Sequence, residues 1–303
     1  MIVEAIASST AQVLPTHTPT HVAPIPTVLP DVHYQVIGDS GARTLWVVFV
    51  IMAIASALFA GWSLKVAVSN RLYHVITTVI TIIAAISYFA MATGQGVSVK
   101  TTVIHHHHEH GVPDTTTTIH RQVFWARYVD WLFTTPLLLL DLGILAGLSG
   151  AHILMAIIAD VVMIVVGLMA SFGTENTPQK WGNFAISMLA FLVVIWHLAL
   201  NGRTAVRNVS QNVANFYMAI AGFTVVVWTA YPVVWGVTAG GHLSIDGEII
   251  AYAILDVLAK VVFGAWLLVT HAKLPETNVE LKGFWANGLN REGLLRLDEE
   301  EGA

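Results

Sequence analysis

Cysteine is absent from this 303-residue chain, and charged residues are scarce. Without cysteine, both disulfide bonds and thiolate chemistry are excluded. Charged residues make up 11% of the sequence and hydrophobic residues 55%, and the mean hydropathy is +0.69. No soluble domain of this size has such a composition. We therefore expect the chain to lie in a lipid bilayer and to have no nucleic acid partner.

Long apolar runs recur seven times along the chain. Runs of about 20 apolar residues cross a bilayer as helices. The seven runs cover approximately residues 44–66, 72–94, 121–142, 148–171, 181–201, 213–239 and 247–272. They predict an all-α membrane protein, with one seven-transmembrane-helix bundle over residues 41–273.

The two ends of the chain differ in charge. Residues 1–40 contain no lysine or arginine and are rich in Pro, Thr and Val, which predicts a flexible tail without a cleaved signal. Basic residues instead occur in the first and fifth connections and in the C-terminal tail, 274–303, with Lys100 and Arg121 as exceptions. Because cytoplasmic segments carry the excess of basic residues, we expect the N-terminus outside and the C-terminus in the cytoplasm. The plasma membrane is the expected location, the vacuolar membrane is the alternative, and a homo-oligomer is left open.

Histidines are concentrated between the second and third apolar runs, at His105–His108, His110 and His120. Such tracts can bind zinc or nickel. An exposed outer loop with incidental metal affinity is the simpler interpretation, so no metal site is predicted.

Lys260 lies inside the last apolar run. A charged ammonium at bilayer depth costs roughly 3 kcal/mol, which marks it as a candidate functional residue. Asp256 lies four residues earlier, one helical turn away on the same face. A lysine in an apolar pocket beside a carboxylate can lose its proton and form a Schiff base with an aldehyde. Once protonated, that group again needs a nearby counterion.

The third apolar run carries an arginine and two carboxylates, Arg127, Asp130 and Asp141. Asp130 precedes Thr134 by four residues and Asp141 by eleven, close to three turns, so these three residues share one helix face. The two carboxylates stand roughly 16 Å apart along the axis. This distance is too long for a shared metal or proton and suits two ends of a proton path. The alternative is an interhelical ion pair at Arg127–Asp130, with Asp141 capping the helix.

Three motifs follow one another along the chain. They are Arg127-Tyr128-x-Asp130-Trp131-x-x-Thr134-Thr135-Pro136 in the third run, Trp228-Thr229-Ala230-Tyr231-Pro232-Val233-Val234-Trp235 in the sixth, and Asp256-Val257-Leu258-Ala259-Lys260 in the seventh. With them, the sequence resembles the microbial (type 1) rhodopsins over about residues 44–272. The segment Gly283–Arg291 is similar to the tail of the fungal opsins. The resemblance implies all-trans retinal bound covalently to Lys260.

Aromatic and apolar residues around Lys260 predict walls for such a polyene. Trp228, Tyr231 and Trp235 recur at i, i+3 and i+7, and flat indole rings suit a polyene. The predicted cofactor contacts are Lys260, Tyr128, Trp131, Thr135, Leu138, Met163, Gly167, Trp228, Tyr231 and Trp235. On the fifth helix, Trp181 and Phe184 both remain candidates. Leu138 lies where family members carry leucine or glutamine, and leucine implies green absorption.

The resemblance also implies roles for the charged residues. Asp130 and Asp256 would form the counterion of Lys260, with Arg127 balancing their excess negative charge. Asp130 would accept a proton, with Thr134 hydrogen-bonding to its carboxylate. Asp141, among leucines, would stay protonated and return a proton from the cytoplasmic side. These roles describe a light-driven outward proton pump, which is an ion transporter rather than an enzyme.

The proton exit departs from the family pattern. Glu248 resembles one member of the family's release pair, but Gly236–Gly241, near the place of its partner, contains no carboxylate. Asp246 is the nearby substitute, and the departure puts fast or early proton release in doubt. Asp160 resembles a protonated acid near the retinal ring, and an interhelical hydrogen bond is an equal alternative.

The first alternative function is a sensory photoreceptor that signals through a partner. Sensors often lack an acid where Asp141 stands, which favours the pump. A light-gated channel is disfavoured by the apolar cytoplasmic half, and a chloride pump would lack the carboxylate of Asp130. A seven-span protein without a chromophore is the remaining alternative, and added retinal would leave it colourless.

Overall fold

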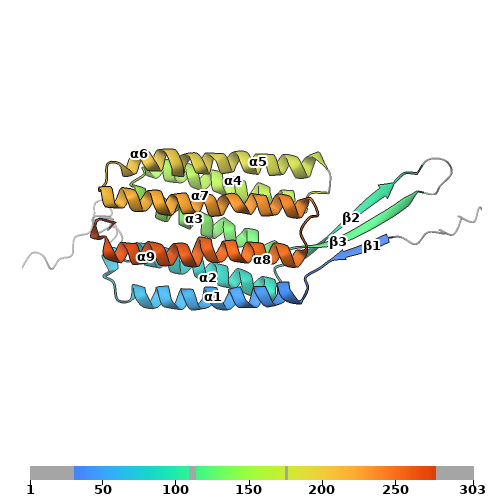
Figure 1. The fold of residues 1–303 in the computed structure, drawn as a ribbon, viewed down its shortest axis with the longest axis horizontal. Helices are drawn as coiled ribbons and strands as arrows, with labels where there is room; N and C mark the ends of the chain where they lie inside the picture. Colours follow the sequence, from blue (N-terminus) through green and yellow to red (C-terminus); the bar gives the residue numbers. More distant parts are fainter. Residues whose placement is uncertain (1–30, 109–113, 175–176, 278–303) are drawn as a thin grey trace, which may run out of the picture.

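In the computed structural model, which describes residues 31–108, 114–174 and 177–277, a bundle of long helices carries a small sheet at one end (Figure 1). Seven helical segments within the described residues are long and apolar enough to cross a membrane, which confirms the predicted spans. The first four are α1 (Asp39–Ser63), α2 (Leu72–Ala92), α3 (Ala126–Ala146) and α4 (Gly150–Phe172). A short 3₁₀ turn, η1 (Val68–Asn70), precedes α2.

The last three spans contain two π-helical segments. The fifth joins α5 (Pro178–Ile195), the π segment η2 (Trp196–Gly202) and α6 (Arg203–Val206), and the sixth is α7 (Gln211–Ala239). The seventh joins α8 (Ile245–Asp256), the π segment η3 (Val257–Val262) and α9 (Phe263–Lys273), followed by the 3₁₀ turn η4 (Pro275–Thr277). Single π turns within helices often mark functional sites.

Hydroxyl side chains begin four of the helices. Each accepts a hydrogen bond from a backbone N–H in the first turn and so satisfies a donor that lacks a helical partner. These caps are Ser149 for α4, Thr177 for α5, Ser210 for α7 and Ser244 for α8. Helix α3 ends at Gly147, which adopts a φ of 71°, a left-handed conformation that glycine tolerates. These local signals set the short connections of the bundle.

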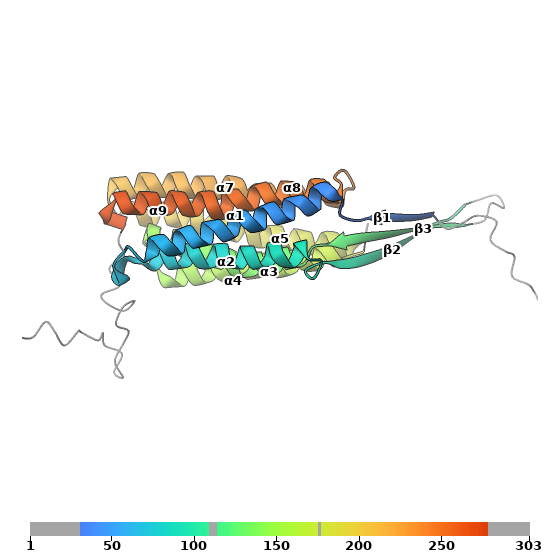
Figure 2. The same ribbon diagram turned by 90° about the horizontal axis from the view of Figure 1, so that it is seen from below.

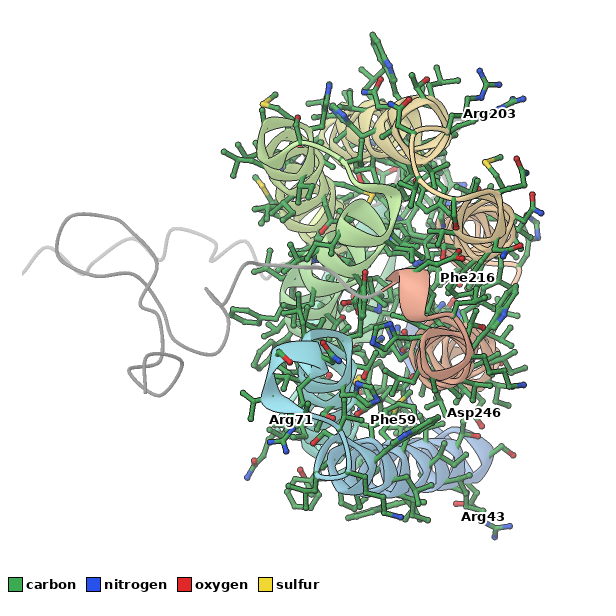
Figure 3. The ribbon with its side chains drawn as sticks, turned by 90° about the vertical axis from the view of Figure 1, so that its left-hand side faces the viewer. Arg43, Phe59, Arg71, Arg203, Phe216 and Asp246 are labelled. Atoms are coloured by element: carbon green, nitrogen blue, oxygen red, sulfur yellow. The ribbon has the colours of Figure 1, made fainter. Side chains whose placement is uncertain are left out.

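Helix α3 lies inside the bundle, in contact with α2, α4 and α7. Its buried side chains include the polar residues Arg127, Asp130 and Asp141. Large apolar side chains such as Leu58, Leu189 and Val226 point outward, as expected for helices surrounded by lipid. Viewed along the helices from the end opposite the sheet, side chains fill the space between the ribbons (Figure 3). The charged residues of α3 are therefore held in the protein interior rather than at the lipid surface.

The sheet extends beyond the bundle in both side views (Figures 1 and 2). Its strand order is β1 (Asp31–Gln35), β3 (Thr115–Val123), β2 (Ser98–His106); β3 pairs parallel with β1 and antiparallel with β2. Two sequence predictions need correction here. Residues 31–40, predicted to belong to the flexible tail, form β1 and the start of α1, and the third span begins at Ala126 rather than 121. In both places β-branched and polar residues pair with a neighbouring strand, a long-range contact that composition does not reveal.

The histidine tract lies partly in this sheet rather than wholly in a loop. His105 and His106 end β2, and the His108 backbone N–H and the His107 ring hydrogen-bond to the Asp114 carboxylate at 3.0 and 2.8 Å. These hydrogen bonds lower the pKa of the Asp114 carboxyl. No group of three metal-ligating side chains gathers within the described residues. His110 and the fungal-type segment Gly283–Arg291 lie outside them.

Candidate functional site

Lys260 lies in the π segment η3, at the centre of the bundle. Its ammonium nitrogen is 2.7 Å from Oδ1 of Asp256 and 2.9 Å from Oδ2 of Asp130, and all three side chains are at most 2% exposed. The pairing of Lys260 with Asp256 follows from their i, i+4 spacing, whereas Asp130 comes from α3. One buried cation thus faces two carboxylates from different helices.

The two carboxylates differ in their hydrogen bonds. Besides Lys260, Asp256 accepts from Tyr88 at 2.6 Å, from the Trp131 indole at 3.1 Å and from Tyr231 at 2.9 Å. An ionised carboxylate is an acceptor only, so these donors fit a charged Asp256.

Asp130 has fewer partners. Apart from its ion pair with Lys260, neither of its oxygens accepts a hydrogen bond from the described residues. The Thr134 hydroxyl donates to the main-chain oxygen of Asp130 at 2.9 Å, whereas the sequence had predicted a bond to the carboxylate. Asp130 therefore has more acceptor sites open to a proton than Asp256, which accepts hydrogen bonds on both of its oxygens.

Arg127 pairs with Glu248 rather than with Asp130. Its Nη1 lies 3.1 Å from Glu248 Oε1, and its guanidinium lies 4.3 Å from the centre of the Tyr252 ring. Arg121 from β3 binds the other oxygen of Glu248 at 2.8 Å. The sequence had used Arg121 only as an argument about topology, because the fold alone brings β3 to α8. Asp246 accepts from the Gly38 N–H at the start of α1, at 2.7 Å.

Asp141 lies fully buried near the other end of α3, as the sequence spacing predicts. Leu138, Leu139 and Leu142 are buried around it on the same helix. Neither carboxyl oxygen of Asp141 has a hydrogen-bond partner among the described residues. The two acids of α3 are thus separated along the helix, with Asp130 on the side of the sheet and Asp141 on the opposite side.

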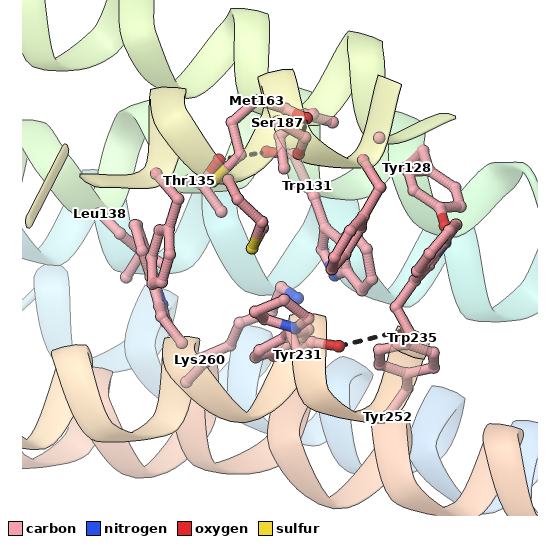
Figure 4. A pocket seen from close by; sticks show the side chains of 18 residues that line it. Tyr128, Trp131, Thr135, Leu138, Met163, Ser187, Tyr231, Trp235, Tyr252 and Lys260 are labelled. Carbon is pink, nitrogen blue, oxygen red and sulfur yellow. Dashed lines mark hydrogen bonds between the residues drawn. The ribbon is translucent and has the colours of Figure 1, made fainter. Parts of the chain in front are cut away.

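Lys260 lines a cavity whose other walls are mainly apolar and aromatic side chains (Figure 4). All ten residues predicted to contact a cofactor line it: Tyr128, Trp131, Thr135, Leu138, Met163, Gly167, Trp228, Tyr231, Trp235 and Lys260. The sequence did not predict Ile164, Met188, Phe191 and Tyr252 as lining residues. An amine in the wall of an apolar cavity fits a long apolar aldehyde such as retinal, because the amine can bond to the aldehyde carbon and the apolar walls exclude water.

Helix α5 contributes Phe184 to this cavity rather than Trp181. The Phe184 ring stacks on Trp235 with 4.5 Å between centroids and 8° between planes. Trp181 is 43% exposed and lines a second cavity between the bundle and the sheet. Phe184, Ser187, Met188 and Phe191 recur at helical spacing, which is the signal that could have identified this face.

Asp160 and Thr135 connect α4 to α3 beside the cavity. The Thr135 hydroxyl lies 2.5 Å from Asp160 Oδ2 and 2.7 Å from the Trp131 carbonyl oxygen. The hydroxyl is thus placed to donate to either oxygen, and its contact with Asp160 joins the two helices. This geometry matches the interhelical hydrogen bond predicted for Asp160, whereas the protonated acid stays a prediction.

Comparisons with known proteins agree with this architecture. The model of the family described as bacteriorhodopsin-like protein matches residues 41–274. Opsin-1 of Neurospora crassa is 48% identical over 94% of both chains. The crystal structure of the light-driven proton pump LR (Mac) from Leptosphaeria maculans is 59% identical, with a TM-score of 0.78 over 81% of this chain and 99% of that one. Halorhodopsin, a light-driven chloride pump, is 29% identical, with a TM-score of 0.68 over 79% of this chain and 98% of that one.

Proposed function

The chain belongs to the bacteriorhodopsin-like family of integral, multi-pass membrane proteins, and on this premise we propose that it is a light-driven outward proton pump. Members of the rhodopsin family bind retinal. We assign all-trans retinal to the cavity lined by Lys260, as a covalent Schiff base with this lysine. When bound, retinal supplies the absorption of light and a light-driven change in proton affinity at the Lys260 nitrogen.

The observation that carries this proposal is the unequal environment of the two carboxylates beside Lys260. Asp256 is held by Tyr88, Trp131 and Tyr231 and remains the fixed negative charge. Asp130 lies 2.9 Å from the Lys260 nitrogen with no other donor on its oxygens, so it is the group that accepts a proton. General acid–base groups act at such hydrogen-bond distances.

Asp141 supplies the replacement proton from the opposite side. It lies eleven residues further along α3, enclosed by leucines and out of contact with water. A buried carboxyl group without a cation beside it is more stable in its neutral form, so it can hold a proton until Asp130 has taken one. Because α3 begins next to the sheet, Asp130 lies nearer to the sheet than Asp141. A proton that passes from Asp141 to the Lys260 nitrogen, and from that nitrogen to Asp130, therefore moves toward the sheet. With the N-terminus outside, this direction is outward.

Glu248, Arg121 and Arg127 form the exit side of the path. All three line the cavity between the bundle and the sheet. Each oxygen of Glu248 binds one guanidinium, so its partners are two cations rather than a second carboxyl group. Together with the absence of a carboxylate from Gly236–Gly241, this favours a proton exit without the family's release pair and keeps fast or early proton release in doubt.

The test is light-induced acidification of a lightly buffered suspension of cells that express the protein and are supplied with retinal. An outward proton pump acidifies the medium, and an uncoupler abolishes the signal. A chloride pump would instead give a signal that an uncoupler enhances and sulfate medium removes. A coloured protein that moves no ions would replace the pump with the sensory photoreceptor. Lys260→Ala serves as the control without bound chromophore.

A further inference from the structure

A group of buried polar rings lies at the end of the bundle opposite the sheet. Tyr73 and His74 begin α2, and His271 is near the end of α9; each is at most 6% exposed. The His271 ring lies 4.9 Å from Tyr73 and 5.9 Å from His74, centre to centre. Figure 3 looks onto this end, where Arg71, the residue before α2, is labelled. No role has been given to these three residues in the pump described above.

The rings connect to Asp141. Tyr73 belongs to the same buried cluster as Leu138, Leu139 and Leu142, which flank Asp141 on α3. The Tyr73 hydroxyl, both ring nitrogens of His74 and both carboxyl oxygens of Asp141 are buried without a hydrogen-bond partner among the described residues. An unsatisfied buried polar atom costs about 1–3 kcal/mol, and in proteins such groups are usually joined by ordered water. Five such atoms between α2 and α3 make this region suited to a hydrogen-bonded chain that ends at Asp141.

His271 is arranged to hold and exchange a proton. The Thr277 hydroxyl donates its one proton to the Leu274 carbonyl oxygen at 2.6 Å, so at 2.7 Å from His271 Nδ1 it accepts. Nδ1 therefore carries a hydrogen, and Nε2 is the nitrogen that gains or loses a proton. Thr277 accepts from Nδ1 in the neutral and in the protonated ring, so His271 can gain a proton at Nε2 without a change of this partner.

The remaining groups that face the rings come from α1 and the start of α2. Trp62 packs edge-on against His74 at 5.7 Å, and the charged neighbour of His74 is Arg71. A positive charge beside His74 makes it the less suitable ring for binding a proton. His271 faces Tyr73, His74 and Thr277, none of which is a permanent cation. The entry point is therefore His271.

We propose that His271 takes up protons at this end of the protein and passes them through Tyr73 and His74 to Asp141. In the transfer, Nε2 of protonated His271 loses its proton to the chain, and the ionised Asp141 carboxylate gains one. Neutral His271 is restored and binds the next proton from the medium. The proposal rests on Asp141 acting as the internal proton donor of the pump. It makes His271 and its neighbours the relay that recharges Asp141.

The first experiment separates uptake from release. After a light flash, a pH-indicator dye reports proton release and uptake, and time-resolved infrared spectroscopy reports the Asp141 carboxyl group. In His271→Gln and in Tyr73→Phe, we expect uptake and Asp141 reprotonation to slow by about tenfold or more, with release unchanged. His152→Gln is the matched control, since His152 is an exposed histidine at the start of α4, at the same end of the bundle. Added imidazole should restore fast uptake in His271→Ala.

The second experiment uses the protein without chromophore. Nuclear magnetic resonance of ¹⁵N-histidine-labelled protein should show His271 with hydrogen on Nδ1 and titrating at Nε2. Thr277→Val should remove this preference. A His271 that never binds a second proton between pH 4 and 9, roughly the range over which perturbed histidines titrate, would overturn the relay.

The kinetic outcomes are distinguishable. Unchanged uptake in both His271→Gln and Tyr73→Phe, with release and uptake intact in the wild type, would overturn the relay alone. Equal slowing in His152→Gln would do the same. Absence of release and uptake in a coloured wild type would instead overturn the proposed pump. Should His271→Gln fail to fold, Tyr73→Phe and His74→Gln carry the same test.

Discussion

Arg121 on β3 and Glu248 on α8 form an ion pair of 2.8 Å that joins the sheet to the helical bundle. Arg121 is 17% exposed and Glu248 14%, and the same guanidinium donates to the Gln35 side chain of β1 at 2.5 Å. Glu248 holds Arg127 with its other oxygen. The sheet thus contributes a charged group to the exit side of the proposed proton path.

Replacing Arg121 should weaken this attachment. Arg121→Gln removes the cation from one oxygen of a mostly buried carboxylate while Arg127 remains, and we expect a loss of about 1–3 kcal/mol in stability. Thermal loss of helical circular dichroism in detergent measures the change. The control is Arg43→Gln, an exposed residue near the start of α1. Equal stability of the two variants would show that the ion pair does not secure the sheet.

Lys260→Ala should give a folded protein that stays colourless after retinal is added. Lys260 is the lysine that lines the apolar cavity, and alanine has no amine for a covalent bond. Visible absorption after washing is the measurement, with circular dichroism to confirm folding. Lys65→Ala, at an exposed lysine after α1, should be coloured. A band that persists in Lys260→Ala would contradict the assignment of the attachment site.

The colour should depend on Leu138 and Asp130. We expect green absorption, with a shift to the blue in Leu138→Gln, because Leu138 lines the cavity. Acid should shift the band to the red, since protonation of Asp130 removes a negative charge 2.9 Å from the Lys260 nitrogen and narrows the excitation gap. Asp130→Asn should be red-shifted already at neutral pH and show no further acid shift. Blue absorption at neutral pH, or an acid titration without a red shift, would refute this.

Asp141→Asn should slow proton uptake without slowing proton release. Asparagine keeps the size of the side chain but delivers no proton, so reprotonation must come from the medium and should slow by about 10²-fold or more, with strong pH dependence. Added azide, a small diffusible acid, should restore much of the speed. Asp130→Asn, by contrast, should abolish transport. Flash photolysis and light-induced acidification measure both, and an unchanged rate in Asp141→Asn would rule out this donor.

Two glycines in the fifth and sixth spans should respond oppositely to alanine. A Cβ on Gly202 would lie 1.8 Å from the hydroxyl of Tyr217, which is buried and donates to the Leu198 carbonyl oxygen. We expect Gly202→Ala to cost about 1–3 kcal/mol through overpacking. A Cβ on Gly222 meets no atom within 4 Å, so Gly222→Ala should be neutral or stabilise α7 by up to about 1 kcal/mol. The difference in thermal bleaching temperature between the two coloured variants tests this.

Much of the core site is local in the sequence and was predictable from it. Lys260 and Asp256 are one helical turn apart, and Asp130, Thr134 and Asp141 share a face of α3, because helix geometry fixes both relationships once the segments are helical. The seven spans follow from apolar runs that only a helix can carry across a bilayer.

Contacts between distant segments were decided by the tertiary structure. Which of Trp181 and Phe184 enters the cavity depends on the rotation of α5 against α7, and the partner of Arg127 depends on where α8 meets α3. The sheet forms because β1 and β2 both pair with β3. Tyr73 contacts His271 because α2 packs beside α9. The sequence by itself determined the helices and the chemistry on each face. Only packing, which joins residues far apart in the chain, decided which faces meet.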